Sequence, residues 1–248
     1  MISMKNILVS LFLFGITGIL MSFETQPDGD QDCRKELQNY MKQLRKINFP
    51  IGKTVYFMDV SVSVVTSPDV AATKTRVKMY MNASQLHCIS ESYSTYQDDR
   101  YTFVIFPERK LIIWSQGASN PDSNLKLNQT LNFQDSVVNQ SKITSCELKQ
   151  NATGAYKVVT MEPWENLKEQ QHIARMEYHI NQTNHKVEKA ITYYQPGEKI
   201  YSKSLTYNEV DLNYTKMKMN KPVYYQVFSD QNKLLSKYKG YQVIDQRD

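Results

Sequence analysis

The feature that most constrains the fold of this chain is a long series of segments in which apolar and polar residues alternate. In the clearest of them, Val60, Val62 and Val64 are separated by single serines. A period of two is typical of a β-strand with one buried face. Short turn sequences separate most of these segments, and short connections make neighbouring strands antiparallel, because parallel pairs need long crossovers. The sequence therefore predicts an antiparallel meander.

About eleven strands follow from this pattern, and an antiparallel sheet of that size curls or closes. We therefore expect a barrel, a half-barrel or a sandwich. The segments that predict strands are Val60–Val64, Val77–Asn82, Leu86–Tyr96, Tyr101–Phe106, Leu111–Trp114, Ile143–Lys149, Ala155–Met161, Gln171–Ile180, Lys186–Tyr194, Lys199–Tyr207, Val223–Phe228 and Lys237–Ile244.

One amphipathic helix is predicted before the first strand, from Asp32 to Ile47. Its apolar residues have the spacing of a single helical stripe, and they are Leu37, Tyr40, Met41, Leu44 and Ile47. A second, short helix is predicted over Phe133–Asn139. Because a helix with one apolar stripe must lie on another surface, we expect both helices to cover the mouth of an antiparallel half-barrel. The predicted fold class is mainly β (α+β).

The N-terminus has the pattern of a secretory signal peptide. Lys5 precedes an apolar run from Ile7 to Leu20, which is too short to span a bilayer comfortably. We expect residues 1–23 to be a signal peptide and residues 24–248 to form one secreted or periplasmic domain; an uncleaved N-terminal anchor is the alternative. No later segment reaches the roughly 20 apolar residues of a membrane helix, so the mature chain is not expected to span a membrane.

Three cysteines, Cys33, Cys88 and Cys146, lie in the expected mature chain. An odd number cannot pair completely within one chain. One disulfide with a free thiol and three buried reduced thiols both remain open, and the interpretation that we favour is three small apolar packing residues. No C-x-x-C or Cys/His ligand spacing is present, so the sequence does not indicate a zinc site or a thioredoxin-type redox site.

The net charge argues against nucleic-acid binding, and the absence of known motifs argues against an enzyme. Lys and Arg number 30 against 25 Asp and Glu, and the net charge of +5 is too small to indicate nucleic-acid binding. The motifs of nucleotide binding, serine hydrolases and zinc peptidases are absent. Asp98 and Asp99 are adjacent carboxylates, but they lie in a predicted turn, where aspartates commonly bind the local backbone. We expect no enzyme, no cofactor and no metal; a hydrolase assembled from distant residues is the alternative. The four histidines do not have the spacing of metal ligands, and we expect them at the surface. They are His87, His172, His179 and His185.

Six Asn-x-Ser/Thr sequons are present, and they begin at Asn82, Asn128, Asn139, Asn151, Asn181 and Asn213. A eukaryotic secreted glycoprotein would use such sites. A bacterial envelope protein rich in asparagine would carry them unmodified. Both hosts remain open at this point.

Bulky apolar side chains in the predicted strands mark the candidate binding site. A curved sheet turns one face inward, and the enclosed volume either fills with side chains or holds an apolar ligand. Methionines and large aliphatic residues suit adaptable contact with acyl chains. The candidate ligand-binding residues are Met58, Val60, Val62, Val77, Met79, Met81, Phe103, Ile105, Ile112, Trp114 and Met176. An interaction module with a filled core is the alternative.

Four stretches are similar in style to one group of envelope proteins. They are Val77-Lys-Met-Tyr-Met81, Tyr96-Gln-Asp-Asp-Arg-Tyr101, Phe106-Pro-Glu-Arg-Lys-Leu-Ile-Ile-Trp114 and the closing Tyr238-Lys-Gly-Tyr-Gln-Val-Ile-Asp245. Together with an N-terminal helix before a long meander, they make the chain resemble the bacterial periplasmic lipoprotein-carrier (LolA/LolB-like) superfamily. The Arg-Pro-x-x-Phe-Arg-Trp segment typical of the carriers is absent, and Arg76 and Arg100 are the candidate counterparts of its arginine.

The resemblance implies a half-barrel that sequesters acyl chains without a cofactor and without covalent chemistry. It implies a lipid, or the acyl chain of a lipoprotein, as the ligand and an envelope protein as a further partner. We therefore expect an exported envelope protein that binds an apolar or lipid-linked ligand between its sheet and its helices.

Overall fold

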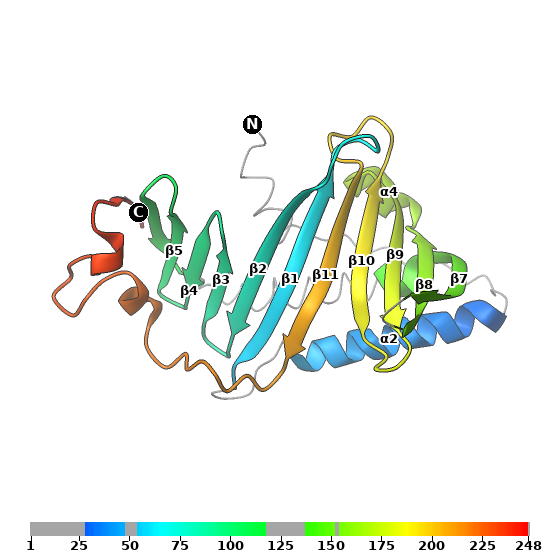
Figure 1. Ribbon diagram of the computed structural model, residues 1–248, viewed down its shortest axis with the longest axis horizontal. Coiled ribbons are helices and arrows are strands. Elements are labelled where there is room, and N and C mark those ends of the chain that lie inside the picture. Colours follow the sequence, from blue (N-terminus) through cyan, green and yellow to red (C-terminus); the bar gives the residue numbers. More distant parts are fainter. Residues whose placement is uncertain (1–27, 48–53, 118–136, 152–153, 248) are drawn as a thin grey trace.

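A computed structural model describes residues 28–47, 54–117, 137–151 and 154–247. Within these ranges twelve strands lie side by side in one sheet, whose two outermost strands are β12 and β7. Figure 1 labels the part of the sheet from β5 to β7. The order across the sheet is β12-β6-β5-β4-β3-β2-β1-β11-β10-β9-β8-β7. This confirms the predicted mainly β fold, with an open sheet and few helices. The predicted signal peptide and residues 133–136 of the predicted central helix lie outside the described residues; residues 137–140 are helical.

The strands agree with the predicted segments over most of the chain. They are β1 (Tyr56–Val65), β2 (Thr73–Met81), β3 (Leu86–Ser90), β4 (Ser94–Gln97), β5 (Tyr101–Phe106), β6 (Leu111–Gln116), β7 (Lys142–Asn151), β8 (Gly154–Glu162), β9 (Ile173–Asn181), β10 (Val187–Tyr194), β11 (Ser202–Asp211) and β12 (Gln242–Gln246). Neighbouring strands are antiparallel, as predicted, with one exception: β12 pairs with β6 in parallel.

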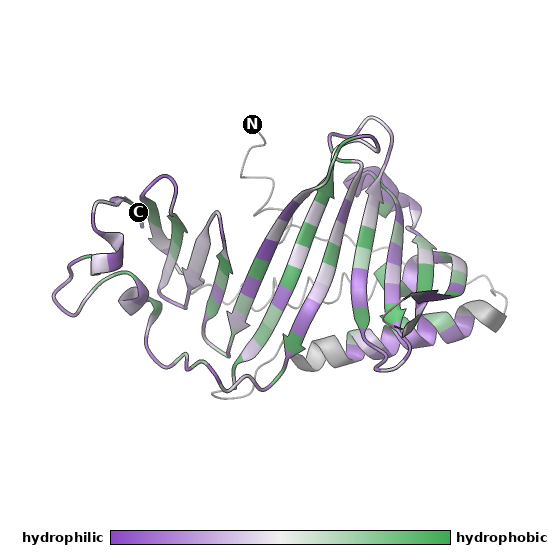
Figure 2. Cartoon of the chain, in the orientation of Figure 1, coloured by the Kyte–Doolittle hydropathy of each residue, from purple (hydrophilic) through white to green (hydrophobic). Residues whose placement is uncertain are grey.

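The pairing of β1 with β11 joins the two halves of the sheet. Strands β1 to β6 form one half and β7 to β11 the other, and Val62 on β1 pairs with Leu205 on β11. A bulge between Asp59 and Val60 interrupts this ladder. Because partners across a ladder point to the same face, the register carries each face continuously from one half to the other. Figure 2 shows the resulting alternation of apolar and polar residues along β1, β2 and β11.

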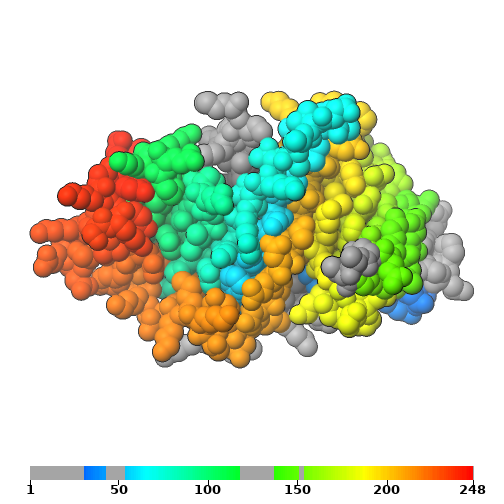
Figure 3. Space-filling model, in the orientation of Figure 1, coloured from blue at the N-terminus to red at the C-terminus, as the bar shows by residue number. Residues whose placement is uncertain are grey.

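Helix α2 (Asp28–Ile47) defines the inner face of the sheet, because it packs on one side of the second half. It runs across the strands rather than along them (Figure 1). Leu37 and Tyr40 are buried in a cluster with Val159 and Met161 of β8 and Met176 of β9. In the space-filling view the helix is almost hidden behind the sheet (Figure 3). Leu37, Tyr40 and Met41 of the predicted stripe are thus buried as expected, and the helix begins four residues earlier than predicted. Among the described residues, no helix combines the length and the apolar character needed to cross a bilayer.

Residues 213–241, which we call the C-terminal segment, cover the opposite, outer face at the far end of the sheet (Figure 3). Two 3₁₀ helices lie in it, η1 (Val223–Gln226) and η2 (Ser236–Tyr238). The fully buried side chains of Val223 and Val227 pack against Phe103 and Ile112. The aspartate of the β4–β5 turn holds the segment in place, since Asp98 Oδ2 accepts a hydrogen bond of 2.9 Å from the backbone N–H of Val223.

Three predicted boundaries are wrong, each for a local reason. The predicted strand Val223–Phe228 is η1 and the residues after it, because the backbone N–H groups of Tyr225 and Val227 donate within the segment, to the carbonyls of Pro222 and Tyr224, rather than to a neighbouring strand. The predicted strand Lys237–Ile244 is divided into η2 and β12 at Gly240, whose φ is +81°. The predicted strand Leu86–Tyr96 is the hairpin of β3 and β4. One helix, α4 (Glu165–Gln171), was not predicted.

A disulfide between Cys33 on α2 and Cys146 on β7 ties the helix to the last strand of the sheet. This corrects the interpretation of all three cysteines as reduced packing residues; Cys88 is free and buried, as that interpretation expected. The two bonded residues are 113 positions apart in the sequence. Closing so long a loop removes much of the conformational freedom of the unfolded chain, which stabilises the folded state by about 5 kcal/mol in the chain-entropy model.

Replacing Cys33 and Cys146 together by serine should lower the free energy of unfolding by about 2–4 kcal/mol, measured by urea denaturation at pH 7. Without reductant, the denatured wild type should titrate as one free thiol per chain, and after reduction as three. Cys88→Ala keeps the disulfide and controls for the loss of a buried sulfur. Three reactive thiols in denatured, unreduced protein would contradict the assignment.

Candidate functional site

The inner face of the first half and of the adjoining strand β11 carries apolar side chains that are only half-buried. The strand pairing places these side chains on the same face as Val60 and Val77, whose side chains are buried. We call the half-buried group the inner apolar surface. It consists of Met58, Val62 and Val64 on β1, Met79 and Met81 on β2, Val104 on β5, Leu111 and Ile113 on β6, and Leu205 and Val210 on β11.

Part of this surface belongs to a small cluster of its own. Val77, Cys88, Tyr93 and Phe106 form the buried centre of the cluster, and half-buried side chains of β1, β2, β5 and β6 pack against it. The cluster that contains α2 lies on β7 to β11 instead. The described contacts of the helix therefore lie on the second half, whereas the inner apolar surface lies on the first half and on β11, the strand that adjoins it.

Charged side chains are rare on the inner face. Among the paired residues of the described strands, the register gives inner positions to only two, Lys157 on β8 and Lys203 on β11. The outer face of β1 and β2 is polar by comparison, with Lys74, Arg76 and Lys78 all exposed. The two faces of the first half thus differ in chemistry, and only the inner one suits an apolar ligand.

Seven of the eleven predicted binding residues lie on the inner face. Met176 belongs to the cluster beneath α2. The other six are on β1 and β2, where the register brings them together, and they are Met58, Val60, Val62, Val77, Met79 and Met81. The sequence-based prediction did not include the half-buried apolar residues of β6 and β11, although their alternation in the sequence is the same.

The other four predicted residues, Phe103, Ile105, Ile112 and Trp114, lie on the outer face beneath the C-terminal segment. The first three are almost fully buried. Strands β5 and β6 are apolar on both faces, so a period of two could not indicate which face is the inner one. These four side chains form a filled core cluster, and we do not include them in the proposed site.

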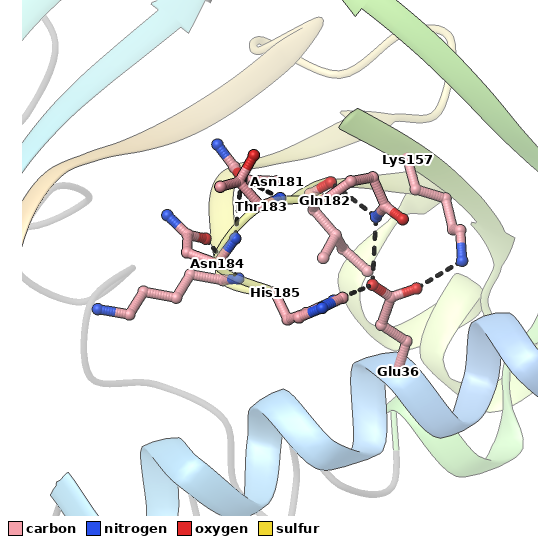
Figure 4. Close-up of polar contacts among 9 residues, drawn as sticks. Glu36, Lys157, Asn181, Gln182, Thr183, Asn184 and His185 are labelled. Atoms are coloured by element: carbon pink, nitrogen blue, oxygen red, sulfur yellow. Dashed lines mark hydrogen bonds and ion pairs between the residues drawn. The ribbon is translucent and has the colours of Figure 1, made fainter. Parts of the chain in front are cut away.

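A polar cluster joins α2 to the sheet (Figure 4). The carboxylate of Glu36, whose side chain is 15% exposed, accepts a hydrogen bond of 2.6 Å from Lys157 Nζ on β8. Its other oxygen lies 3.2 Å from Gln182 Nε2 and 3.3 Å from His185 Nδ1, both in the β9–β10 turn. An Asx turn organises that turn, since Asn181 Oδ1 accepts from the backbone N–H groups of the two residues Thr183 and Asn184.

The electrostatics of this cluster favour an ionised Glu36. Burial alone would raise the pKa of Glu36, but the hydrogen bonds from Lys157, His185 and Gln182 outweigh burial and hold the pKa below its ordinary value. A shallow depression of about 500 Å³ lies over the cluster and is lined by polar residues of α2, β8 and the β9–β10 turn. The carboxylate and its donors satisfy one another, so we assign the cluster to docking of the helix rather than to catalysis.

The other titratable residues named in the sequence analysis make local structural contacts. Asp98 Oδ1 accepts from the backbone N–H groups of Arg100 at 2.9 Å and Tyr101 at 2.8 Å, which confirms the predicted local role of a turn aspartate. His87 is not at the surface as predicted: it is 1% exposed and its ring packs edge-on against Tyr96. Burial lowers the pKa of His87 to about 4. The described ranges contain no group of three or more His, Cys, Asp or Glu side chains suited to a metal ion.

Arg76 and Arg100 are the candidate counterparts of the arginine in the carriers' Arg-Pro-x-x-Phe-Arg-Trp segment. Both lie away from the inner face. Arg76 lies on the outer face, where its Nε and Nη2 donate to the carboxylate of Asp59, the Nη2 bond measuring 2.6 Å. These bonds from Arg76 hold the pKa of Asp59 below its ordinary value despite burial. Arg100 is exposed in the β4–β5 turn.

The described sequons differ in accessibility. Asn82 is buried, and its amide Nδ2 donates to the backbone oxygen of Met219 at 2.9 Å. The Nδ2 of Asn181 donates to Glu188 Oε1 at 2.7 Å. Asn139 and Asn213 are exposed, whereas Asn128 and the side chain of Asn151 lie outside the described part of the chain. In the folded state a glycan therefore has room at Asn139 and Asn213 but not at Asn82.

The sequence matches no protein-family model and no curated protein. Among solved structures, the fold is similar to that of the lipoprotein LppX from Mycobacterium tuberculosis, with 13% identity, a TM-score of 0.43, and coverage of 75% of this chain and 98% of that one. It is also similar to a LolA superfamily protein from Nitrosomonas europaea, with 12% identity, a TM-score of 0.28, and coverage of 73% and 94%.

A third similar structure is the MucA/MucB complex of Pseudomonas aeruginosa, with 9% identity, a TM-score of 0.40, and coverage of 73% of this chain and 56% of that one. The likenesses concern the fold alone.

Replacing Glu36 by Gln should lower the free energy of unfolding at pH 7 by about 1–2 kcal/mol, measured by urea denaturation. Because the folded-state pKa of Glu36 is depressed, its contribution is fully present above the ordinary value of 4.5 and is lost as the pH falls through the folded-state pKa. The difference between wild type and variant should therefore shrink below pH 4.5. Glu147→Gln removes an exposed ion pair with Lys149 as a matched control and should change little. A difference that is the same at pH 7 and pH 3 would contradict the assignment.

Proposed function

We propose that this protein is an exported envelope protein that binds the apolar chain of a lipid, or of a lipid-linked ligand, on the inner apolar surface. Binding is non-covalent and needs neither a cofactor nor a metal. The observation that carries the proposal is a group of half-buried methionine and aliphatic side chains on the inner face of β1, β2, β5, β6 and β11, five of which pack against one buried cluster. Surfaces of this kind commonly mark ligand or partner sites in soluble proteins.

The chemistry of this surface supports an apolar chain rather than a polar ligand. Paired inner positions on β1 to β6 carry no charged side chain in the described strands. Methionines such as Met58, Met79 and Met81 adapt their shape to a flexible partner. An acyl chain transferred from water to such a surface gains about 0.8 kcal/mol for each buried methylene group.

Two further observations support export. The disulfide between Cys33 and Cys146 is of a kind that persists in oxidising compartments and is rare in the cytosol of mesophiles. The N-terminal sequence has the pattern of a signal peptide. A bacterial periplasm fits both, and an envelope protein that delivers or receives the ligand would be the partner.

Met79→Asp tests the site directly. The variant should bind the neutral methyl ester of cis-parinaric acid, a polyene whose fluorescence rises on leaving water, at least about tenfold more weakly than wild type, because burying a charge next to an apolar chain is costly. Affinity is measured by fluorescence titration of the purified protein.

Ser63→Asp is the matched control, because it places the same charge on β1 but on the outer face. It should leave the affinity within about twofold of wild type. Circular dichroism and size-exclusion chromatography establish that both variants are folded. A folded Met79→Asp variant that binds the ester as tightly as wild type would exclude the inner apolar surface as the site.

A further inference from the structure

The net positive charge of the chain is concentrated in the C-terminal segment, residues 213–241. The segment contains six lysines and a single acidic residue, Asp230, so its net charge of +5 equals the formal net charge of the whole chain. The rest of the sequence therefore has as many acidic as basic residues. The six lysines are Lys216, Lys218, Lys221, Lys233, Lys237 and Lys239.

The side chains of all six lysines are exposed, while the main chain between them is anchored to the sheet. Met219 and Val223 lie between the lysines in the sequence and are buried. Asn82 Nδ2 donates to the backbone oxygen of Met219 at 2.9 Å, and Gln85 Nε2 donates to that of Lys221 at 2.7 Å. The segment is thus a preformed cationic surface, and a partner need not meet the entropic cost of ordering it.

The acidic residues of the elements that adjoin the segment are themselves compensated. Asp98 in the β4–β5 turn is buried and accepts hydrogen bonds from backbone N–H groups, and Asp99 is followed by the exposed Arg100. Asp245, the only carboxylate of β12, pairs with Arg247 Nη2 at 2.5 Å. The positive charge of the segment therefore faces solvent without a neutralising surface beside it.

Aromatic and apolar side chains lie among the lysines of the segment. Tyr225 is 41% exposed, and Tyr214, Met217, Tyr224 and Tyr241 are half-buried. A tyrosine has an apolar ring and a polar end, and such side chains are enriched where a membrane meets water. Lysines beside an anionic leaflet are attracted by its negative surface potential. This combination fits the headgroup region of an anionic bilayer.

The position of the segment relates it to the inner apolar surface. The segment covers the outer face of β5 and β6, and the inner face of the same two strands carries Val104, Leu111 and Ile113. Figure 3 shows the segment, coloured orange to red, at one end of the molecule. A protein that docks by this end holds the inner apolar surface near the bilayer.

We propose that the C-terminal segment binds the surface of a membrane rich in anionic phospholipids. The lysines recognise the negative charge of the headgroups rather than one particular lipid. The choice of a membrane rests on the proposed function, because an apolar chain that the protein carries must enter or leave through a bilayer. The proposal adds to that function the surface on which the ligand is exchanged.

The test is cosedimentation of the purified protein with two kinds of vesicle, one of phosphatidylcholine and one of equal parts phosphatidylcholine and phosphatidylglycerol. Wild type should bind the anionic vesicles at least about tenfold more tightly. It should lose most of this binding between about 0.1 M and about 1 M salt, because the screening length falls from about 10 Å to about 3 Å. A triple variant should bind the anionic vesicles at least about tenfold more weakly than wild type; its changes are Lys218→Gln, Lys221→Gln and Lys233→Gln.

A second triple variant removes the same charge from exposed lysines elsewhere, with Lys74→Gln, Lys78→Gln and Lys199→Gln. It should bind the anionic vesicles within about twofold of wild type. Met79→Asp should also keep vesicle binding within about twofold, because docking does not use the inner apolar surface. Circular dichroism establishes that each variant is folded.

Three outcomes would overturn this inference: equal binding of wild type to both kinds of vesicle, no binding to either, or equal losses in the two triple variants. Absence of vesicle binding would leave an acidic protein as the partner of the lysines. The proposed function would still stand in each case if wild type binds the methyl ester of cis-parinaric acid. Binding to anionic vesicles without binding of the ester would support the docking surface and contradict the proposed function.

Discussion

The structure depends on one geometric constraint: helix α2 is shorter than the sheet is wide. Helix α2 has 20 residues and is about 30 Å long, whereas twelve strands at a spacing of about 4.8 Å extend over about 50 Å. Its buried stripe packs against β7 to β11, and the disulfide from Cys33 and the Glu36–Lys157 pair hold it there. The apolar inner face of β1 to β6 lies beyond its contacts, and the proposed site follows from that arrangement.

The two ends of the sheet are covered on different faces. At one end, α2 fills the inner face with a conventional core. At the other, β5 and β6 are apolar on both sides, and the C-terminal segment covers their outer face, held by Asp98 and by the parallel pairing of β12 with β6. The outer side chains of Phe103, Ile105 and Ile112 are therefore core residues, whereas the inner side chains of Val104, Leu111 and Ile113 belong to the inner apolar surface.

Much of this arrangement could be predicted from the sequence, because period-two alternation and short turns determine antiparallel strands locally. The helical stripe around Leu37 and the turn at Asp98 were predicted correctly for the same reason. Three features depend on contacts between distant residues: the pairing of Cys33 with Cys146, the parallel addition of β12, and the face to which Phe103 points in a strand that is apolar on both sides.

The most direct test of the central claim is photo-crosslinking with a long-chain probe that carries a diazirine near the end of its hydrocarbon chain. The protein is irradiated with the bound probe, digested, and mapped by mass spectrometry. Our account predicts adducts on inner-face residues of β1, β2 and β11, among them Met58, Met79 and Val62. Adducts confined to the outer face, to α2 or to the C-terminal segment would contradict it, and so would a protein that takes up no probe.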